Sequence, residues 1–385
     1  MSDPRIDHLV HEWMSGRLSR RALVRHLAAM GMSAAAISAA LPIRGAALAA
    51  QVATPAEEII TAPEFEGQTL VVTSYGGTWE EFMRQEILPP WEEATGAMIE
   101  LAVGLSTDWM TQLRAAGVDN PPFDVVIANE TYISTGRLEG FFDTLPLDKV
   151  PNLEHVHEQL RMPDDIGVLA LLSPIGFGYM TEEVEVPSPA SWQMLPDYLP
   201  SVGIYNASNS ACAQHIMMMA EILTGDYHDW EAGFEWIRDN LRDARQSDFS
   251  GDMETLLTTG EVNLGLLDSP AVARLKGQGV AIDWAAPEEG LLMFEQNTNV
   301  TVGSERKDLA YSFVNYWLGT DVQRKFMEQY FWTPANTQVQ VPEDLADLIP
   351  VTPGNLGGIK LWDYEWLNSG VREEMIMRWN REMSL

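Results

Sequence analysis

The sequence predicts an α/β protein built from two lobes, and two observations carry this prediction. First, the chain has 385 residues of which 46% are apolar, more than one hydrophobic core usually serves. Second, apolar strand-like runs alternate with helical patterns in two separate sets, one starting near residue 68 and one near residue 202. Strands that alternate with helices form parallel sheets covered by helices, so each set predicts one α/β lobe.

The composition excludes several classes of function. The chain has 56 Asp and Glu residues against 24 Lys and Arg residues, a net charge of -32, which repels nucleic acid and anionic membrane surfaces. Cys212 is the sole cysteine, so neither an internal disulfide framework nor a cysteine metal cluster can form. The sequence contains no P-loop, dinucleotide fingerprint or G-x-S-x-G motif. We therefore predict no cofactor, no metal and no catalytic residues.

The first 49 residues have the order of a secretory signal peptide. Four arginines between residues 17 and 25 precede an apolar run over 27–43, and small residues at Ala47 and Ala49 offer a cleavage site. The stretch from Ser19 to Leu23 resembles a twin-arginine signal, which predicts export in the folded state by the twin-arginine machinery. Because no cysteine lies near the cleavage site, we expect a periplasmic protein without a lipid anchor.

The first α/β set starts after a flexible lead-in over 50–66, which lacks apolar periodicity. A buried strand over 68–74 precedes a helix over 79–95, broken or kinked at Pro89 and Pro90 and ended by Gly96. The next expected elements are a strand over 98–103, a helix over 109–116 and a strand over 123–128.

The second set follows a loop over 187–195. A strand over 202–208 opens it, and apolar periodicity continues through two helices and two buried strands. These elements are helices over about 211–224 and 230–241, a strand over 262–268 and a strand near Asn299.

A glycine turn joins the first strand to the first helix. Tyr75, Gly76 and Gly77 end the strand, and Trp79 lies in the first turn of the helix. Glycines let a backbone approach a ligand closely, and a helix start after a strand presents free N–H groups. The turn is therefore predicted to face a small molecule.

Seven stretches together resemble the spermidine/putrescine-binding family, which comprises extracellular solute-binding proteins of ABC importers. They follow the order of the family over nearly the whole mature chain. In sequence order they are VVTSYGGTWEEF, PWEEATGAMIEL, FDVVIANETYI, PIGFGYMTEEVEVPSPASWQML, GEVNLGLLDSPAV, APEEG and DLAYSFVNYWLGTDVQRKF.

The resemblance implies a type II periplasmic-binding fold, in which two lobes clamp a ligand in the cleft between them. Crossover segments would lie near 175–179 and 297–300, and hinge closure would bury the ligand. The implied division gives lobe 1 as residues 67–177 plus 298–335, and lobe 2 as residues 178–297 plus 336–385.

The implied function is a non-catalytic, monomeric periplasmic component that delivers a small organic solute to an inner-membrane ABC permease. Two alternatives stay open because a fold does not fix a function. One is an exported enzyme with the same two lobes. The other is a receptor that passes its solute to a sensor protein.

The ligand class stays open between an amine and a neutral or zwitterionic solute. Polyamine binders hold amines with carboxylates and stack alkyl chains between aromatic rings. Where the family carries acidic ligands, this chain has Asn206, Asn209 and Asn297, and amides favour a less positive ligand. Carboxylates would still be supplied if the matched register moved by one residue. The predicted ligand-binding residues are Tyr75, Gly76, Gly77, Trp79, Asn129, Tyr132, Asn206, Asn209, Asp248, Asp268, Glu295, Asn297 and Trp332.

Overall fold

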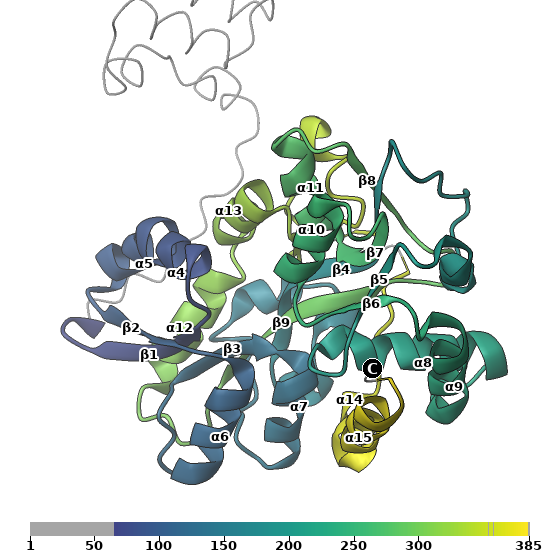
Figure 1. Ribbon diagram of the computed structural model, residues 1–385. Coiled ribbons are helices and arrows are strands. Elements are labelled where there is room, and N and C mark those ends of the chain that lie inside the picture. The colour runs from purple at the N-terminus through teal and green to yellow at the C-terminus, as the bar shows by residue number, and fades with distance from the viewer. Residues whose placement is uncertain (1–64, 353, 357, 384–385) are drawn as a thin grey trace, which may run out of the picture. The chain divides into compact units, whose positions relative to one another are not determined.

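The computed structural model describes residues 65–352, 354–356 and 358–383, which belong to one compact unit (Figure 1). The predicted signal peptide and most of the predicted lead-in lie outside the described residues. No helix among the described residues is long and apolar enough to cross a membrane.

The described strands form one ten-stranded sheet in the order β2-β1-β3-β9-β4-β7-β5-β6, with β8 and β10 paired to β4. Pairing is parallel within β2-β1-β3 and within β7-β5-β6, and antiparallel where β9 and β4 join these groups. The strands are β1 (Thr69–Ser74), β2 (Met98–Val103), β3 (Val125–Asn129), β4 (Val168–Met180), β5 (Val202–Tyr205), β6 (Arg245–Ser247), β7 (Leu264–Asp268), β8 (Ile282–Ala285), β9 (Leu292–Val300) and β10 (Thr333–Pro334).

Helices cover the sheet between these strands (Figure 1). The α-helices are α4 (Thr78–Phe82), α5 (Leu88–Thr95), α6 (Ser106–Ala116), α7 (Glu130–Leu138), α8 (Ser210–Thr224), α9 (Trp230–Leu241), α10 (Ser250–Thr259), α11 (Ser269–Gly277), α12 (Lys307–Trp317), α13 (Thr320–Tyr330), α14 (Tyr364–Trp366) and α15 (Arg372–Glu382). Short π-helical turns span Met83–Ile87 and Leu367–Val371, and 3-10 turns span Pro151–His155, Glu158–Leu160, Pro163–Asp165, Trp192–Tyr198 and Glu343–Leu345.

Apolar side chains form two large cores, one on each side of the sheet's middle strands. The first core includes Leu70, Val125 and Leu309, and the second includes Ile204, Leu264 and Trp379. β4 and β9 pass through both cores. Along β4 the side chains change core between Leu172 and Ile175, and along β9 Leu292 and Phe294 pack with the second core whereas Met293 and Val300 pack with the first. The divisions expected at 177 and 297 lie inside the same two strands.

The chain after residue 336 also divides between the cores. Val339 and Ile349 pack with Met327 of α13, on the side of the first core. Trp362 and Trp379 pack into the second core. The division that the resemblance implies places all of 336–385 in the second lobe.

Several local predictions are confirmed and one is corrected. The strand over 98–103 and the helix over 230–241 have the predicted bounds. Gly96 ends α5 with a left-handed φ of 71°, as its position predicts. The predicted break at Pro89 and Pro90 instead falls one turn earlier, in the π-helical turn. Prolines are tolerated at the start of a helix, where the missing N–H needs no partner, so the two prolines begin α5.

Two further bounds differ from the prediction. A 3-10 turn, Trp192–Tyr198, occupies part of the expected loop because Trp192 is fully buried in the second core. β9 begins at Leu292, well before the strand expected near Asn299.

The C-terminal segment, residues 362–383, joins the two halves of the fold. Tyr364, Leu367 and Trp379 pack into the second core. Asn368 Nδ2 donates hydrogen bonds to Thr131 O at 2.8 Å and Ser134 Oγ at 2.6 Å, both in α7. In Figure 1 this segment accordingly lies beside α7 as well as below α8.

Candidate functional site

The register of the sheet brings the carboxyl ends of β3 and β7 toward one point. β3 ends with Asn129 opposite Gln296, and β7 ends with Asp268 opposite Ile175. Ser173 and Phe294 pair with each other between these two positions. Ligands of open α/β sheets bind beyond the carboxyl ends of strands, so this point between the two cores is the candidate site.

Tyr75 and Asn129 form the side of the site that belongs to the first core. The Tyr75 hydroxyl lies 2.9 Å from Ser106 Oγ and accepts a hydrogen bond from Asn129 N at 3.2 Å. Burial raises the pKa of Tyr75 to about 12, so its hydroxyl is neutral at physiological pH. The ring of Tyr75 meets Trp79 edge-on at 6.2 Å, and Trp79 in turn lies 5.7 Å from Trp332.

Asp268 and Tyr205 form the opposite side. Asp268 is 5% exposed, and its two oxygens accept hydrogen bonds from Ser173 Oγ, at 2.8 Å, and from Ser250 Oγ. The Tyr205 ring contacts Phe294 at 5.8 Å between centroids. Burial, and then the charge of Asp268, raises the pKa of Tyr205 well above its ordinary value. This side therefore holds a buried carboxyl group beside a neutral phenol.

Gln296 lies at the centre, on the same face of β9 as Phe294 because strand side chains alternate between faces. Gln296 is 6% exposed, and its side-chain amide reaches the Tyr75 hydroxyl. We call this group of residues the inner site, and it comprises Tyr75, Asn129, Ser173, Tyr205, Asp268, Phe294 and Gln296. Asp268 is its one ionisable carboxyl group, and no lysine or arginine belongs to it.

Two polar atoms of the inner site lack partners. The Tyr205 hydroxyl and Gln296 Oε1 are buried and make no hydrogen bond of ordinary geometry among the described residues, although Ser250 lies close enough to the Tyr205 hydroxyl to oppose the rise in its pKa. Buried polar atoms are nearly always hydrogen-bonded in folded proteins. A ligand that reached this point could supply the missing hydrogen bonds.

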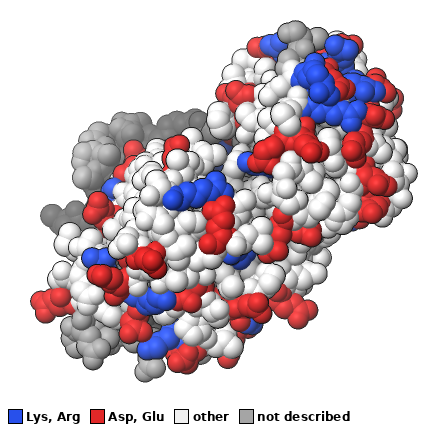
Figure 2. All heavy atoms as spheres, turned by 90° about the horizontal axis from the view of Figure 1, so that it is seen from below, with Lys and Arg blue, Asp and Glu red and all other residues white. Residues whose placement is uncertain are grey.

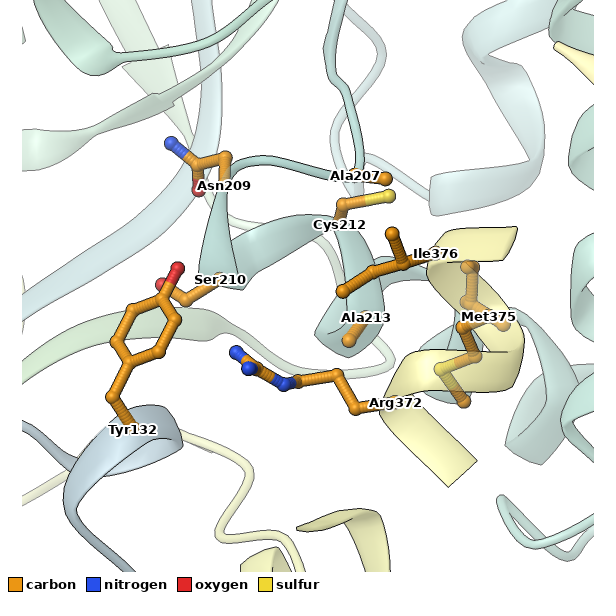
Figure 3. Close-up of a pocket in the computed structure, with 10 residues that line it drawn as sticks. Tyr132, Ala207, Asn209, Ser210, Cys212, Ala213, Arg372, Met375 and Ile376 are labelled. Atoms are coloured by element: carbon orange, nitrogen blue, oxygen red, sulfur yellow. The ribbon is translucent and has the colours of Figure 1, made fainter. Parts of the chain in front are cut away.

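A cavity of about 410 Å³ is lined by residues that lie close in the chain to inner-site residues, and we call it the outer cavity. It lies between α6, α7, the loop after β5 and α15. Asn206 of its lining directly follows Tyr205, and Tyr132 lies one helical turn after Asn129. The Tyr132 hydroxyl donates to Ser208 O at 3.3 Å, which closes the gap between α7 and that loop. A narrower pocket shares Tyr132 and Arg372 with the outer cavity (Figure 3).

The two predicted amides after β5, Asn206 and Asn209, form hydrogen bonds with nearby loop residues and with the start of α8. Asn206 Nδ2 donates to the Asp248 carboxylate, and Asn206 Oδ1 accepts from Ser208 N at 2.9 Å. Asn209 caps α8 by accepting from Ala211 N, at 2.9 Å, and donates to Asp248 O. Asn206 and Asn209 line the cavity and the pocket respectively, while Asp248 is exposed beside them.

Glu295 and Asn297 lie on the other face of β9 from Phe294 and Gln296. Glu295 is 0% exposed and accepts a hydrogen bond from Thr131 Oγ1 at 3.5 Å. Asn297 Nδ2 donates to Glu130, again away from the inner site.

Gly76 and Gly77 are exposed in the turn after β1. Gly77 has a φ of 68°, a conformation that favours glycine, and it is the N-cap residue of α4. Trp332 contacts Trp79, the neighbour of Tyr75.

Sequence reasoning did not select Tyr205, Gln296 or Arg372. Tyr205 could have been found as the last residue of a buried strand. Gln296 could be identified only if the true start of β9 were known. No local sequence pattern marks Arg372. No group of three or more His, Cys, Asp or Glu residues within the described ranges could hold a metal ion.

Comparisons with known proteins place this geometry among related folds. A profile described as bacterial extracellular solute-binding protein matches residues 86–350. The spermidine/putrescine-binding periplasmic protein of Escherichia coli (strain K12) is 21% identical over 66% of this chain and 75% of its own length. The gamma-aminobutyric acid-binding protein of Pseudomonas aeruginosa is 23% identical over 83% of this chain and 92% of its own length.

Solved structures are also similar. A putative extracellular solute-binding protein from Bordetella parapertussis superposes with a TM-score of 0.72 at 23% identity, over 83% of this chain and 99% of that one. An ABC transporter structure from Clostridium perfringens gives a TM-score of 0.71 at 23% identity, over 82% and 100%. These likenesses show a shared α/β architecture.

Proposed function

Because the chain belongs to the bacterial extracellular solute-binding proteins, we propose that it captures a small organic solute carrying a protonated amine at the inner site. Proteins of this family are substrate-binding components of ABC transporters and bind their solutes without converting them. The protein thus has the α/β periplasmic-binding-protein fold and works outside the cytoplasm with an ABC transporter.

The inner site contains a carboxyl group and two buried polar atoms without hydrogen-bond partners, and these features support an amine on the solute. Asp268 is its one charge, while the Tyr205 hydroxyl and Gln296 Oε1 lack partners. An ammonium group offers three donors and a positive charge, so it would satisfy the carboxylate and one or both free acceptors. A buried carboxylate without a cation is costly, and the amine would remove that cost.

Aromatic walls support an alkyl chain next to the amine. Tyr75 lies beside Gln296 and Tyr205 lies beside Phe294, so aromatic rings flank the same stretch of β9. The names of the related proteins give spermidine, putrescine and gamma-aminobutyric acid as what those proteins bind, and each of these compounds carries a primary amine.

We also propose that the protein is made with a twin-arginine signal, is released into the periplasm without a lipid anchor and acts as a monomer. The two cores move as lobes about β4 and β9, since both strands cross between them. The closed form is read by the permease.

Replacing Asp268 tests the proposal. Asp268→Asn keeps the shape but removes the charge, so the dissociation constant for an amine solute should rise at least about tenfold, the lower end for a charge-assisted hydrogen bond. Isothermal titration calorimetry with putrescine, spermidine and γ-aminobutyrate measures it. Asp119→Asn is the control, because Asp119 is exposed in a loop of the first half.

The solute that co-purifies with the mature protein offers an independent check. Native mass spectrometry of protein purified without refolding should release an amine. Release of a compound without an amine, or equal binding by the Asp268 variant and the wild type, would refute the proposal.

A further inference from the structure

Arg372 places a positive charge in the outer cavity. Its guanidinium lies 4.7 Å from the centroid of the Tyr132 ring, and its Nε is buried without a hydrogen-bond partner among the described residues. Figure 3 shows the side chain leaving α15 and pointing between Tyr132 and Ser210, the first residue of α8.

The absence of a carboxylate beside Arg372 is unusual for this chain. Figure 2 shows Lys and Arg side chains mostly bordered by Asp and Glu. Among the described residues, each lysine and arginine other than Arg242 and Arg372 has a described carboxylate oxygen within 4.0 Å. Arg242 is exposed at the end of α9, whereas Arg372 lines a cavity.

The remaining lining of the outer cavity is neutral. Polar groups come from Asn206, Ser208 and Tyr132, and Arg372 is the one charged residue that lines either this cavity or the adjoining pocket. The first turn of α8 also faces the pocket, and the positive end of a helix dipole adds to the guanidinium. The inner site is acidic, and the outer cavity is positive.

We propose that Arg372 binds a carboxylate of the solute, so that the solute is an amino acid with its amine at the inner site and its carboxylate in the outer cavity. The inference rests on the proposed function and specifies its solute. Asn129 of the inner site ends β3 and caps the N-terminus of α7, and Tyr132 of the cavity follows it by three residues, which is about 4.5 Å of helix rise. An amine and a carboxylate separated by a short alkyl chain would span these two regions, whereas a diamine would place a cation against Arg372.

Three four-carbon compounds that differ in the charges at their ends test whether the solute is a diamine, an amino acid or a diacid. Putrescine carries two amines, γ-aminobutyrate carries an amine and a carboxylate, and succinate carries two carboxylates. Calorimetry on the mature protein should show γ-aminobutyrate, or its three- to six-carbon homologues, binding at least about tenfold more tightly than the matched diamine and diacid.

Substitution of Arg372 gives the second arm. Arg372→Gln should weaken binding of the amino acid by about tenfold to a hundredfold, and it should not weaken binding of the diamine, because the repulsion of its second amine is removed. Arg372→Lys should retain part of the amino-acid affinity because the charge remains. Arg242→Gln is the matched control, since it removes an unpaired arginine from the surface and should change neither constant.

The outcomes distinguish this inference from the proposed function. If the diamine binds the wild type more tightly than the amino acid, or if Arg372→Gln weakens both alike, the role of Arg372 is overturned and amine capture still stands. Failure of every compound in the three- to six-carbon series to bind would overturn both. If Arg372→Gln melts at a much lower temperature than the wild type, Arg372→Lys takes its place in the comparison of affinities.

Discussion

Glu295 shows at the scale of one residue how burial controls charge. The carboxyl group is fully buried in β9, near Thr131 and Tyr364, and Oε2 has no partner among the described residues. Burial raises the pKa of Glu295 from 4.5 to about 8. The neutral form is therefore the one that the fold accommodates at physiological pH.

This pKa makes stability fall as pH rises. Between pH 4.5 and about 8 the folded protein holds a proton on Glu295 that the unfolded chain has released, so raising the pH favours unfolding. Glu295→Gln cannot ionise and should remove this dependence. We expect the variant to melt at a higher temperature than the wild type at pH 8, with a smaller difference at pH 5.

Thermal unfolding across this pH range measures the effect, at about 1.4 kcal/mol for each pKa unit. The exposed Glu261→Gln serves as control. A constant difference between wild type and Glu295→Gln at all pH values would show that Glu295 is not titrating as described.

The turn between β1 and α4 carries the prediction at the scale of elements. A Cβ at Gly77 would meet nothing within 4 Å, so the φ of 68° is the one obstacle to a side chain there. Gly77→Ala should lower the free energy of unfolding by about 1 kcal/mol.

Gly251 in the first turn of α10 is the matched control for Gly77. It also has open space around it, but its φ is not positive. Gly251→Ala should stabilise the protein by about 0.4–1 kcal/mol. Denaturant unfolding compares the two variants, and equal effects would contradict the role assigned to the turn.

Elements that depend on local sequence patterns were predicted well, and elements that depend on distant parts of the chain were not. The helix over 230–241 was predictable because its apolar spacing is local, and the strand over 98–103 because its neighbours end it on both sides. Tyr75 was predicted from a glycine turn, and Asp268 was predicted from the resemblance to the solute-binding family. Gln296 was missed because its face depends on where β9 begins.

Other parts of the site depend on contacts between distant residues. Arg372 meets Tyr132 only because the C-terminal segment folds back beside α7. Glu295 is directed away from the inner site by the register of β9, which no local pattern reveals.

At the scale of the whole molecule, the C-terminal segment ties the two halves together. Asn368 satisfies a backbone carbonyl and a hydroxyl in α7 while its neighbours pack in the second core. Asn368→Ala should lower the free energy of unfolding by about 1–3 kcal/mol, because it leaves buried acceptors unpaired. Unfolding should stay a single transition, since β4 and β9 belong to both cores.

Calorimetric unfolding tests this prediction, with Asn240→Ala as the control. Asn240 donates only to Trp236 O within its own helix. Two separate transitions in the Asn368 variant would show that the halves unfold independently and that β4 and β9 do not couple them.

The pairing of β3 with β9 also has a consequence during synthesis. Thr301, just beyond β9, donates to Phe123 O, just before β3, across 178 positions of the chain. A ribosome adds about 5–20 residues per second, so β3 leaves it about 9–36 s before its antiparallel partner exists. Over that interval the nascent chain carries an open strand edge, and its first half cannot mature until most of the second has been translated.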